Sequence, residues 1–440
     1  MDWQGMTAAA LGRAVAGGGA DPVEVAEGFL DAIAAHGMGA RIYARVTPER
    51  ARAEAVAARD RSRAGLLRGP LDGVPLSWKD LFDTAGTPTE AGTALMAGRV
   101  PDRDAAVLEE AARAGTVCLG KTHMTEIAFS GLGLNPVTAT PPNVHDPLRL
   151  AGGSSSGAAA SVAWGLAPAA VGSDTGGSIR LPAAWNDLVG WKPAHGGLSL
   201  RGVVPLAPAF DTVGPIARSV EDAALVWGAL GGPRVDLAGA SLGGAVIGVL
   251  RTVVAESVEE APARALDHAL ARLERAGARL VDLDLPLLPR AYELGQPLYA
   301  GEVWAYWGEA IEENAERMFP PVVARASAGR DVSAAHYLRA REELAALRAG
   351  AHDALAGLDA VACATSAILP PLASAVEADH EAFRVANLAA LRNTRMANLL
   401  GLASISLPTG APSCGLMLSA APGRGGALLR LARAAEAALA

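Results

Sequence analysis

Three short segments of the chain place hydroxyl and amine side chains in glycine-rich surroundings. They are residues 73–86 (GVPLSWKDLFDTAG), 151–165 (AGGSSSGAAASVAWG) and 172–184 (GSDTGGSIRLPAA). Gly- and Ser-rich stretches usually form flexible linkers. Here apolar helix and strand sequence brackets the serine-bearing segments closely, so we expect their loops to be held against a core. Their lysine and serines are therefore candidates for a built reactive site.

Lys79 is the candidate base of this site. Its neighbours in the first segment are large and apolar, namely Val74, Leu76, Trp78, Leu81 and Phe82. This setting predicts a buried stem and amine, and burial lowers the pKa of a lysine towards that of a usable base. The alternative is an ordinary lysine paired with Asp80 or Asp83.

A second pattern resembles a phosphate-binding loop. Residues 115–122 (GTVCLGKT) satisfy G-x-x-x-x-G-K-[ST] letter for letter. A true P-loop needs a strand before its first glycine and a helix after its lysine. Here a predicted helix over 104–114 precedes the glycine, and the intervening residues are themselves a predicted strand. We interpret this pattern as a helix end, a strand and a turn.

A third pattern resembles the nucleophile elbow of a serine hydrolase. Residues 153–157 (GSSSG) match G-x-S-x-G with Ser155 at the centre, and helical sequence follows. The preceding PNVHDPLRLAG is a poor strand, however, and among the histidines only His195 is a fair downstream partner. We favour a turn histidine over a Ser-His-Asp site.

The serine-rich segments together resemble the amidase signature family of Ser-Ser-Lys amide hydrolases. The resemblance rests on GGSSSG and GSDTGGSIRLPAA, with G-V-P-x-x-x-K-D upstream. It extends from about residue 70 to 220 and returns in DAVACATSAILPPL and NLLGLASISLPTG. Lys79, Ser154 and Ser178 occur in the family's order and spacing.

The resemblance implies a role for each matching residue. Ser178 matches the nucleophile, Ser154 the bridging serine beside an unusual cis peptide, and Lys79 the base. Asp174 and Arg180 match positions that support the site by anchoring loops. The oxyanion hole is implied for the backbone N–H groups of Thr175, Gly176, Gly177 and Ser178. A lysine can activate a serine through a second hydroxyl, so the set is chemically coherent.

The resemblance implies an amidase that hydrolyses a small carboxylic amide to the acid plus ammonia or an amine. The alternative within the family is the glutamine-hydrolysing component of a tRNA-dependent amidotransferase. There, an acidic residue begins a D-x-x-T-x-x-x-N segment and grips the glutamine amino group. The corresponding LRNTRMAN segment begins with Leu391, so we favour the free-standing amidase.

Helices and strands must position these residues. Asp21 and Pro22 begin a predicted helix over 21–36, and an Ala/Arg-rich helix is predicted over 48–64. From residue 71 onward, short β-like runs alternate with helices, which predicts an α/β fold. The resemblance implies a mixed central β-sheet covered by helices on both faces, with a mostly helical excursion.

We predict a single domain over residues 1–440. Neither a fixed-period repeat nor a low-complexity linker interrupts the sequence. Its predicted segments are N-terminal helices at 1–65, a catalytic core with the lysine and both serines at 66–220, a helical excursion and substrate region at 221–356, and a return to the core at 357–440.

Composition restricts the classes of function. The formal net charge of −8 provides no basic surplus for nucleic acid. Apolar runs are too short to span a membrane. Cys118, Cys363 and Cys414 predict buried thiols in a reducing compartment, and His123 with Glu126 lacks a third metal ligand. We predict a cytoplasmic enzyme with a small-molecule amide as partner and no nucleic acid, membrane, metal or cofactor, and we leave a homodimer open.

Aromatic side chains concentrate in the excursion. Seven of them lie between residues 290 and 340: Tyr292, Tyr299, Trp304, Tyr306, Trp307, Phe319 and Tyr337. We predict that some of them wall the acyl pocket and favour an apolar or aryl acyl group. The alternatives are an ordinary helical core and a dimer contact.

Overall fold

One mixed sheet of eleven strands forms the centre of the protein in a computed structural model that describes residues 3–440. The strand order is β1-β3-β2-β4-β6-β5-β10-β11-β9-β7-β8. β2 is parallel to both β3 and β4, whereas β4 and β6 are antiparallel. The strands are β1 (Tyr43–Val46), β2 (Pro75–Lys79), β3 (Val117–Thr122), β4 (Ala169–Asp174), β5 (Val189–Lys192), β6 (Thr212–Ala217), β7 (Val246–Leu250), β8 (Arg279–Leu283), β9 (Ala360–Ala364), β10 (Ala403–Pro408) and β11 (Gly415–Ala420).

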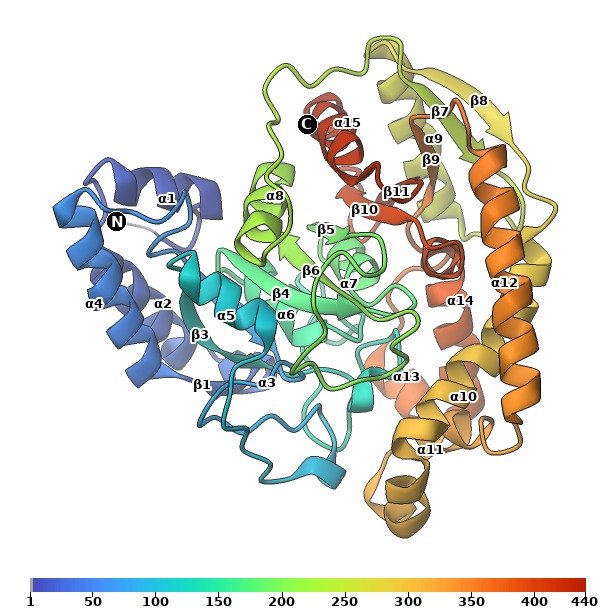
Figure 1. The fold of residues 1–440 in the computed structure, drawn as a ribbon, viewed down its shortest axis with the longest axis horizontal. Helices are drawn as coiled ribbons and strands as arrows, with labels where there is room; N and C mark the ends of the chain where they lie inside the picture. Colours follow the sequence, from blue (N-terminus) through green and yellow to red (C-terminus); the bar gives the residue numbers. More distant parts are fainter. Residues whose placement is uncertain (1–2) are drawn as a thin grey trace.

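Helices cover both faces of this sheet, which confirms the predicted fold class. On one face, α6 (Ser156–Ala163) and α7 (Arg180–Trp185) contact each other and the middle strands. On the other face, α8 (Val220–Ala229), α15 (Gly425–Leu439) and α9 (Glu260–Arg275) pack in a row. The N-terminal helices lie at one end of the molecule (Figure 1). They and the next helix are α1 (Ala8–Ala16), α2 (Pro22–Ala35), α3 (Gly39–Ile42), α4 (Pro48–Ala64) and α5 (Ala106–Arg113).

Local sequence sets the bounds of the first long helices. The Asp21 side chain accepts a hydrogen bond from Val23 N at 2.8 Å, which caps α2, and Pro22 occupies its first turn. α4 ends at Gly65, whose φ of 70° lies in the left-handed region that glycine adopts without a Cβ clash. Both predicted helices are confirmed to within about one residue of their ends.

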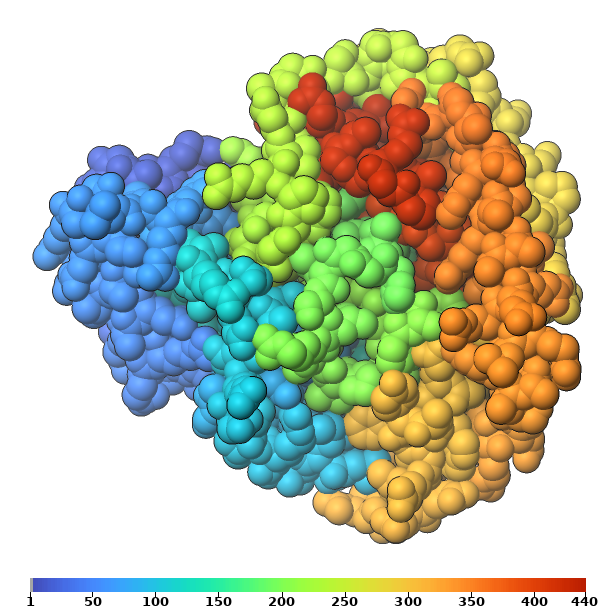
Figure 2. Space-filling view, in the orientation of Figure 1, coloured from blue at the N-terminus to red at the C-terminus, as the bar shows by residue number. Residues whose placement is uncertain are grey.

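The excursion contributes two strands and a helical layer. β7 and β8 extend the same sheet as the N-terminal strands. The long helices lie at the side of the molecule opposite the N-terminal helices, where α10 contacts α11, α12 and α14 (Figures 1 and 2). The helices of this layer and the two that follow β9 are α10 (Leu288–Asn314), α11 (Pro320–Ser327), α12 (Ala334–Ala354), α13 (Ala373–Ala378) and α14 (His380–Leu399). Within residues 3–440, no helix combines the length and the apolar character needed to cross a bilayer.

Candidate functional site

Lys79 is the last residue of β2, and its side chain is fully buried. Its Nζ donates hydrogen bonds to Ser154 Oγ at 2.6 Å and to Ser173 Oγ at 2.8 Å. The structure thus brings together two of the three residues that the sequence singled out, Lys79 and Ser154. It adds Ser173, which sequence reasoning missed.

Sheet pairing explains the contact with Ser173. β2 and β4 are parallel neighbours, with Trp78 opposite Val171, so the carboxyl ends of the two strands meet at one edge of the sheet. Ser173 lies near the end of β4, 94 residues beyond Lys79. The only signal in the sequence was its place in GSDTGG, one residue before Asp174.

The alternative of a lysine paired with its neighbouring carboxylates is wrong. Asp80 instead pairs with Lys121 at 3.1 Å, and Asp83 pairs with Arg99 at 2.6 Å. Burial lowers the pKa of Lys79 to about 7, although the charges of Asp211 and Asp174 oppose this shift. A large fraction of the amine is therefore neutral near pH 7 and has a lone pair available for a proton.

Ser154 and Ser178 lie on two loops that are joined by their backbones. Ser154 follows a cis peptide bond with Gly153 and precedes α6. Ser155 N donates to Ser178 O at 3.3 Å. The Ser178 hydroxyl itself makes no hydrogen bond with any residue from 3 to 440, and it lines a recess. The structure therefore places Ser178 beside the buried pair without a hydrogen bond to Ser154.

The loop that leads to Ser178 presents several backbone donors. Gly177 N donates to Asp174 Oδ1 at 2.9 Å, so this N–H is already occupied. The N–H groups of Thr175, Gly176 and Ser178 have no acceptor among the described residues. Gly177 has a φ of 137°, and a Cβ on it would lie 2.0 Å from the Thr394 Oγ1 atom. Only glycine fits there.

Asp174 and Arg180 form a buried ion pair that holds this loop. Arg180 donates to both carboxylate oxygens of Asp174, with its Nη2 at 2.9 Å and its Nε at 3.0 Å. The same carboxylate also accepts from Asn398 Nδ2 and from backbone N–H groups of the loop. Burial alone would raise the pKa of Asp174, but Arg180, Lys192 and Asn398 together outweigh it, and the pKa falls to about 2. These contacts fit the anchoring role that the resemblance implied.

We expect Asp174→Asn to destabilise the fold by about 3–5 kcal/mol, because it leaves the Arg180 charge buried without a partner. Chemical denaturation followed by circular dichroism measures this change. The matched control is Asp282→Asn, which breaks an exposed ion pair with Arg251 and should cost less than about 1 kcal/mol. Equal losses in the two variants would contradict the anchoring role.

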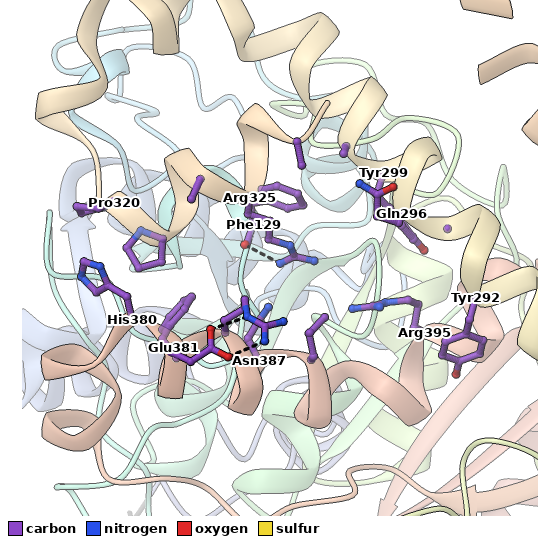
Figure 3. Close-up of a pocket in the computed structure, with 18 residues that line it drawn as sticks. Phe129, Tyr292, Gln296, Tyr299, Pro320, Arg325, His380, Glu381, Asn387 and Arg395 are labelled. Carbon is purple, nitrogen blue, oxygen red and sulfur yellow. Dashed lines mark hydrogen bonds and ion pairs between the residues drawn. The ribbon is translucent and has the colours of Figure 1, made fainter. Parts of the chain in front are cut away.

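A cavity of ≈ 830 Å³ opens beside this site, between α10, α11 and α14 (Figure 3). A narrow recess lined by Ser178, Thr175 and Gly176 adjoins it. Its volume of ≈ 20 Å³ holds roughly one water-sized group. The cavity and the recess share four lining residues: Phe129, Tyr299, Arg325 and Arg395.

Some of the aromatic residues of the excursion line the cavity and others do not, while the use of this cavity for an acyl group stays a prediction. Tyr292 and Tyr299 line the cavity. Trp307 is buried away from it and donates its indole N–H to Pro205 O, while Trp304 packs against Arg330. These tryptophans turn aside because residues of one helix point in different directions around its axis.

The nucleophile-elbow alternative is wrong. Ser155 is fully buried and its hydroxyl donates to Ser173 O at 3.2 Å. His195 lies at the surface, where its Nε2 contacts Pro208 O, and it lines a different cavity. The P-loop look-alike is a strand after a helix, as predicted, since residues 117–122 form β3 and follow α5.

The fold is thus a mixed α/β sheet with a lysine amine buried between two serine hydroxyls, and a third serine, Ser178, lines a recess that adjoins a cavity. The model of the Amidase family matches residues 24–429. The chain belongs to this amidase family, and it is accordingly a hydrolase acting on amide C–N bonds.

Individual relatives and solved structures agree with this assignment. The chain is 33% identical over 399 residues to 2-amino-5-chloromuconic acid deaminase from Comamonas testosteroni. The alignment covers 88% of this chain and 86% of the relative. It is 38% identical over 295 residues to the A-type subunit of glutamyl-tRNA(Gln) amidotransferase from Chloroflexus aggregans, but only 60% of that relative is covered. The native peptide amidase of Stenotrophomonas maltophilia superposes with a TM-score of 0.85 at 29% identity, covering 98% of this chain and 96% of that one.

Proposed function

We propose that the protein hydrolyses a small carboxylic amide to the acid plus ammonia or an amine through an acyl-enzyme on Ser178. The observation that carries this proposal is the buried Lys79 Nζ, 2.6 Å from the Ser154 hydroxyl and without a carboxylate partner. A neutral buried amine can take a proton from a hydroxyl, which a surface lysine near pH 7 cannot do.

In the first half of the reaction, Ser178 Oγ attacks the amide carbon. Its proton passes to Ser154, whose own proton moves to the Lys79 amine. The carbonyl oxygen gains negative charge, and the N–H groups of Thr175, Gly176 and Ser178 stabilise it in the recess. Catalytic hydrogen bonds often shorten only when substrate binds, as this relay requires between the two serines.

In the second half, the tetrahedral intermediate collapses. The proton returns from Lys79 through Ser154 to the leaving nitrogen, and ammonia or an amine departs. Water then attacks the Ser178 ester, and the same relay accepts and returns its proton. Ser173 has a positioning role, because its hydroxyl accepts a second hydrogen bond from the amine at 2.8 Å.

Labelling with a fluorophosphonate probe tests this assignment. We expect peptide mapping to place the adduct on Ser178, with no adduct in Ser178→Ala and slower labelling in Lys79→Ala. A wild-type adduct on Ser155 that depends on His195 would instead restore the elbow mechanism.

The pH dependence follows from the same lysine. Since the base must be unprotonated, kcat/KM for a neutral amide should rise through about pH 7, the pKa of Lys79, and level off above it. Steady-state rates between pH 5 and pH 9 in buffers of constant ionic strength measure this. A profile that falls across this range would contradict a lysine base.

The glutamine-hydrolysing amidotransferase component remains the second candidate, since relatives of that kind are 38% identical over part of the chain. Leu391, which takes the place of the acidic residue, is buried and lines the recess near Ser178. The cavity and recess are lined by one carboxylate, Glu381, and Arg384 already pairs with it. A glutamine ammonium group thus has no free acidic partner there, which supports the free-standing amidase.

A further inference from the structure

Two arginines meet where the cavity narrows towards Ser178. Arg325 extends from α11 and Arg395 from α14, and both line the cavity and the recess. Figure 3 shows their side chains reaching into the same space from different walls. An arginine pair from separate helices at the entrance to a reactive serine is a feature that the proposed mechanism does not use.

Neither guanidinium is neutralised by the protein. Arg325 donates one hydrogen bond to the Phe129 carbonyl at 2.9 Å, and its guanidinium carbon lies 4.0 Å from the centre of the Phe129 ring. The Nη2 atom of Arg395 is buried and has no hydrogen-bond partner among the residues that the structure describes. Within residues 3–440, neither side chain has an Asp or Glu oxygen within 4.0 Å.

The third arginine of the cavity behaves differently. Arg384 donates to both oxygens of Glu381, at 2.7 and 2.6 Å, so its charge is balanced. The unpaired positive charges of Arg325 and Arg395 are therefore confined to the narrow end of the cavity. The protein as a whole is negative, with a net charge of −8. Burial and the neighbouring Arg395 charge also lower the pKa of Arg325. An anion between the two side chains would relieve their repulsion and supply the missing acceptors.

We propose that the acyl part of the substrate carries a carboxylate that binds between Arg325 and Arg395, which makes the substrate a monoamide of a dicarboxylic acid. This inference rests on the proposed function. The recess has room for roughly one water-sized group, which suits the carbonyl oxygen, and the cavity that adjoins it at the two arginines has room for the rest of the acyl chain. Guanidinium groups suit this anion because their planar donors match the two carboxylate oxygens.

The same lining disfavours an amino acid as substrate. Glu381 is the one carboxylate on the walls and is paired with Arg384, so an ammonium group beside the substrate carboxylate would meet the arginine charges without a partner. We therefore expect the chain to prefer succinamate, glutaramate or adipamate over glutamine, which carries an α-ammonium group.

The experiment compares these three ω-carboxamide acids with neutral amides of matching length, such as pentanamide for glutaramate. We expect the best acid to exceed its neutral match in kcat/KM, mainly through a lower KM. Arg395→Gln and Arg325→Gln should each reduce this ratio by roughly 10- to 100-fold, as expected for a hydrogen-bonded charge that loses one partner. Arg395→Lys, which keeps the charge, should lose less.

Arg264→Gln is the control, because it removes an exposed guanidinium that is paired with Glu260 and lines neither the cavity nor the recess. It should keep the ratio within about two-fold of wild type. A second readout is independent of turnover: calorimetric binding of glutarate to Ser178→Ala should weaken in the Ser178→Ala/Arg395→Gln double variant.

The outcomes separate this inference from the proposed function. If Ser178 is labelled and neutral amides are hydrolysed, but no acid exceeds its neutral match and glutarate does not bind, the carboxylate site is wrong and the mechanism stands. If glutarate binding depends on Arg395 while Ser178 resists labelling and no amide is hydrolysed, the arginine site stands and the proposed mechanism is wrong.

Discussion

Ser178→Ala should lower the rate of amide hydrolysis by roughly 10⁴- to 10⁶-fold, the loss seen when a serine nucleophile is removed. The reason is that the other serine and threonine hydroxyls lining the recess are already engaged, since Thr175 Oγ1 donates to Asp211 and Ser130 Oγ donates to Asn387 Oδ1. Ser178 lines the recess, whereas the neighbouring Ser155 and Ser156 are fully buried. The measurement is kcat with a saturating amide, together with circular dichroism to show that the fold is retained.

Ser156→Ala is the matched control for this result. The Ser156 hydroxyl is buried on α6 without a hydrogen-bond partner. Since an unpaired buried hydroxyl costs stability, its removal should leave the rate near wild type and leave the stability unchanged or higher by up to about 1 kcal/mol. A Ser178→Ala protein that retains most of its activity would overturn the assignment of the nucleophile.

Lys79→Met should remove the base and alter how stability depends on pH. Loss of a general base costs typically 10²- to 10⁴-fold in rate, and the relay through Ser154 would have no proton acceptor. The methionine keeps the apolar volume but removes the amine that burial disfavours. We therefore expect a folded protein with little activity at any pH.

The stability change has a definite sign. The pKa of Lys79 is about 7 in the folded protein, against an ordinary value of 10.5. Between these two values the unfolded chain binds more protons at this residue. Wild-type stability should therefore rise with pH relative to Lys79→Met, by up to about 1.4 kcal/mol per pH unit. Below about pH 7 both states are protonated and the difference becomes constant.

Lys192→Met is the control for Lys79→Met. Burial also lowers the pKa of Lys192 to about 7, yet within residues 3–440 its Nζ donates only to the backbone carbonyls of Pro193 and Leu402. It should show the same pH-dependent stability difference while keeping activity within about ten-fold of wild type. Denaturant midpoints at pH 7, 8 and 9 provide the test. If both variants lose activity equally, the loss reflects the general effect of a buried lysine and not a base at Lys79.

Much of the secondary structure followed from local pattern. The helices over 21–36 and 48–64 and the strand inside GTVCLGKT all occur where periodicity and capping predicted them. Residues 43–46 and 212–217 were not predicted as strands, and the helix over 380–399 was also missed. These elements depend on tertiary partners. The strand β6 (212–217), for example, is buried along its whole length because it lies between β4 and β5 in the sheet.

The site divides in the same way. Sequence neighbours predicted that Lys79 is buried, because apolar side chains flank it along the chain. They left open whether it would pair with Asp80 or Asp83. The structure decided against both, because Lys121 and Arg99 from other segments take those carboxylates.

The sequence by itself determined the amidase motifs, their order and the backbone freedom that glycine provides around Ser154 and Ser178. Only the tertiary structure decided which groups face one another. Ser173 reaches the Lys79 amine because two strands pair across 94 residues. Arg325 and Arg395 meet because α11 and α14 wall one cavity. Local sequence specifies side chains and their periodicity, whereas hydrogen bonds and charge contacts between distant segments depend on how sheets and helices pack.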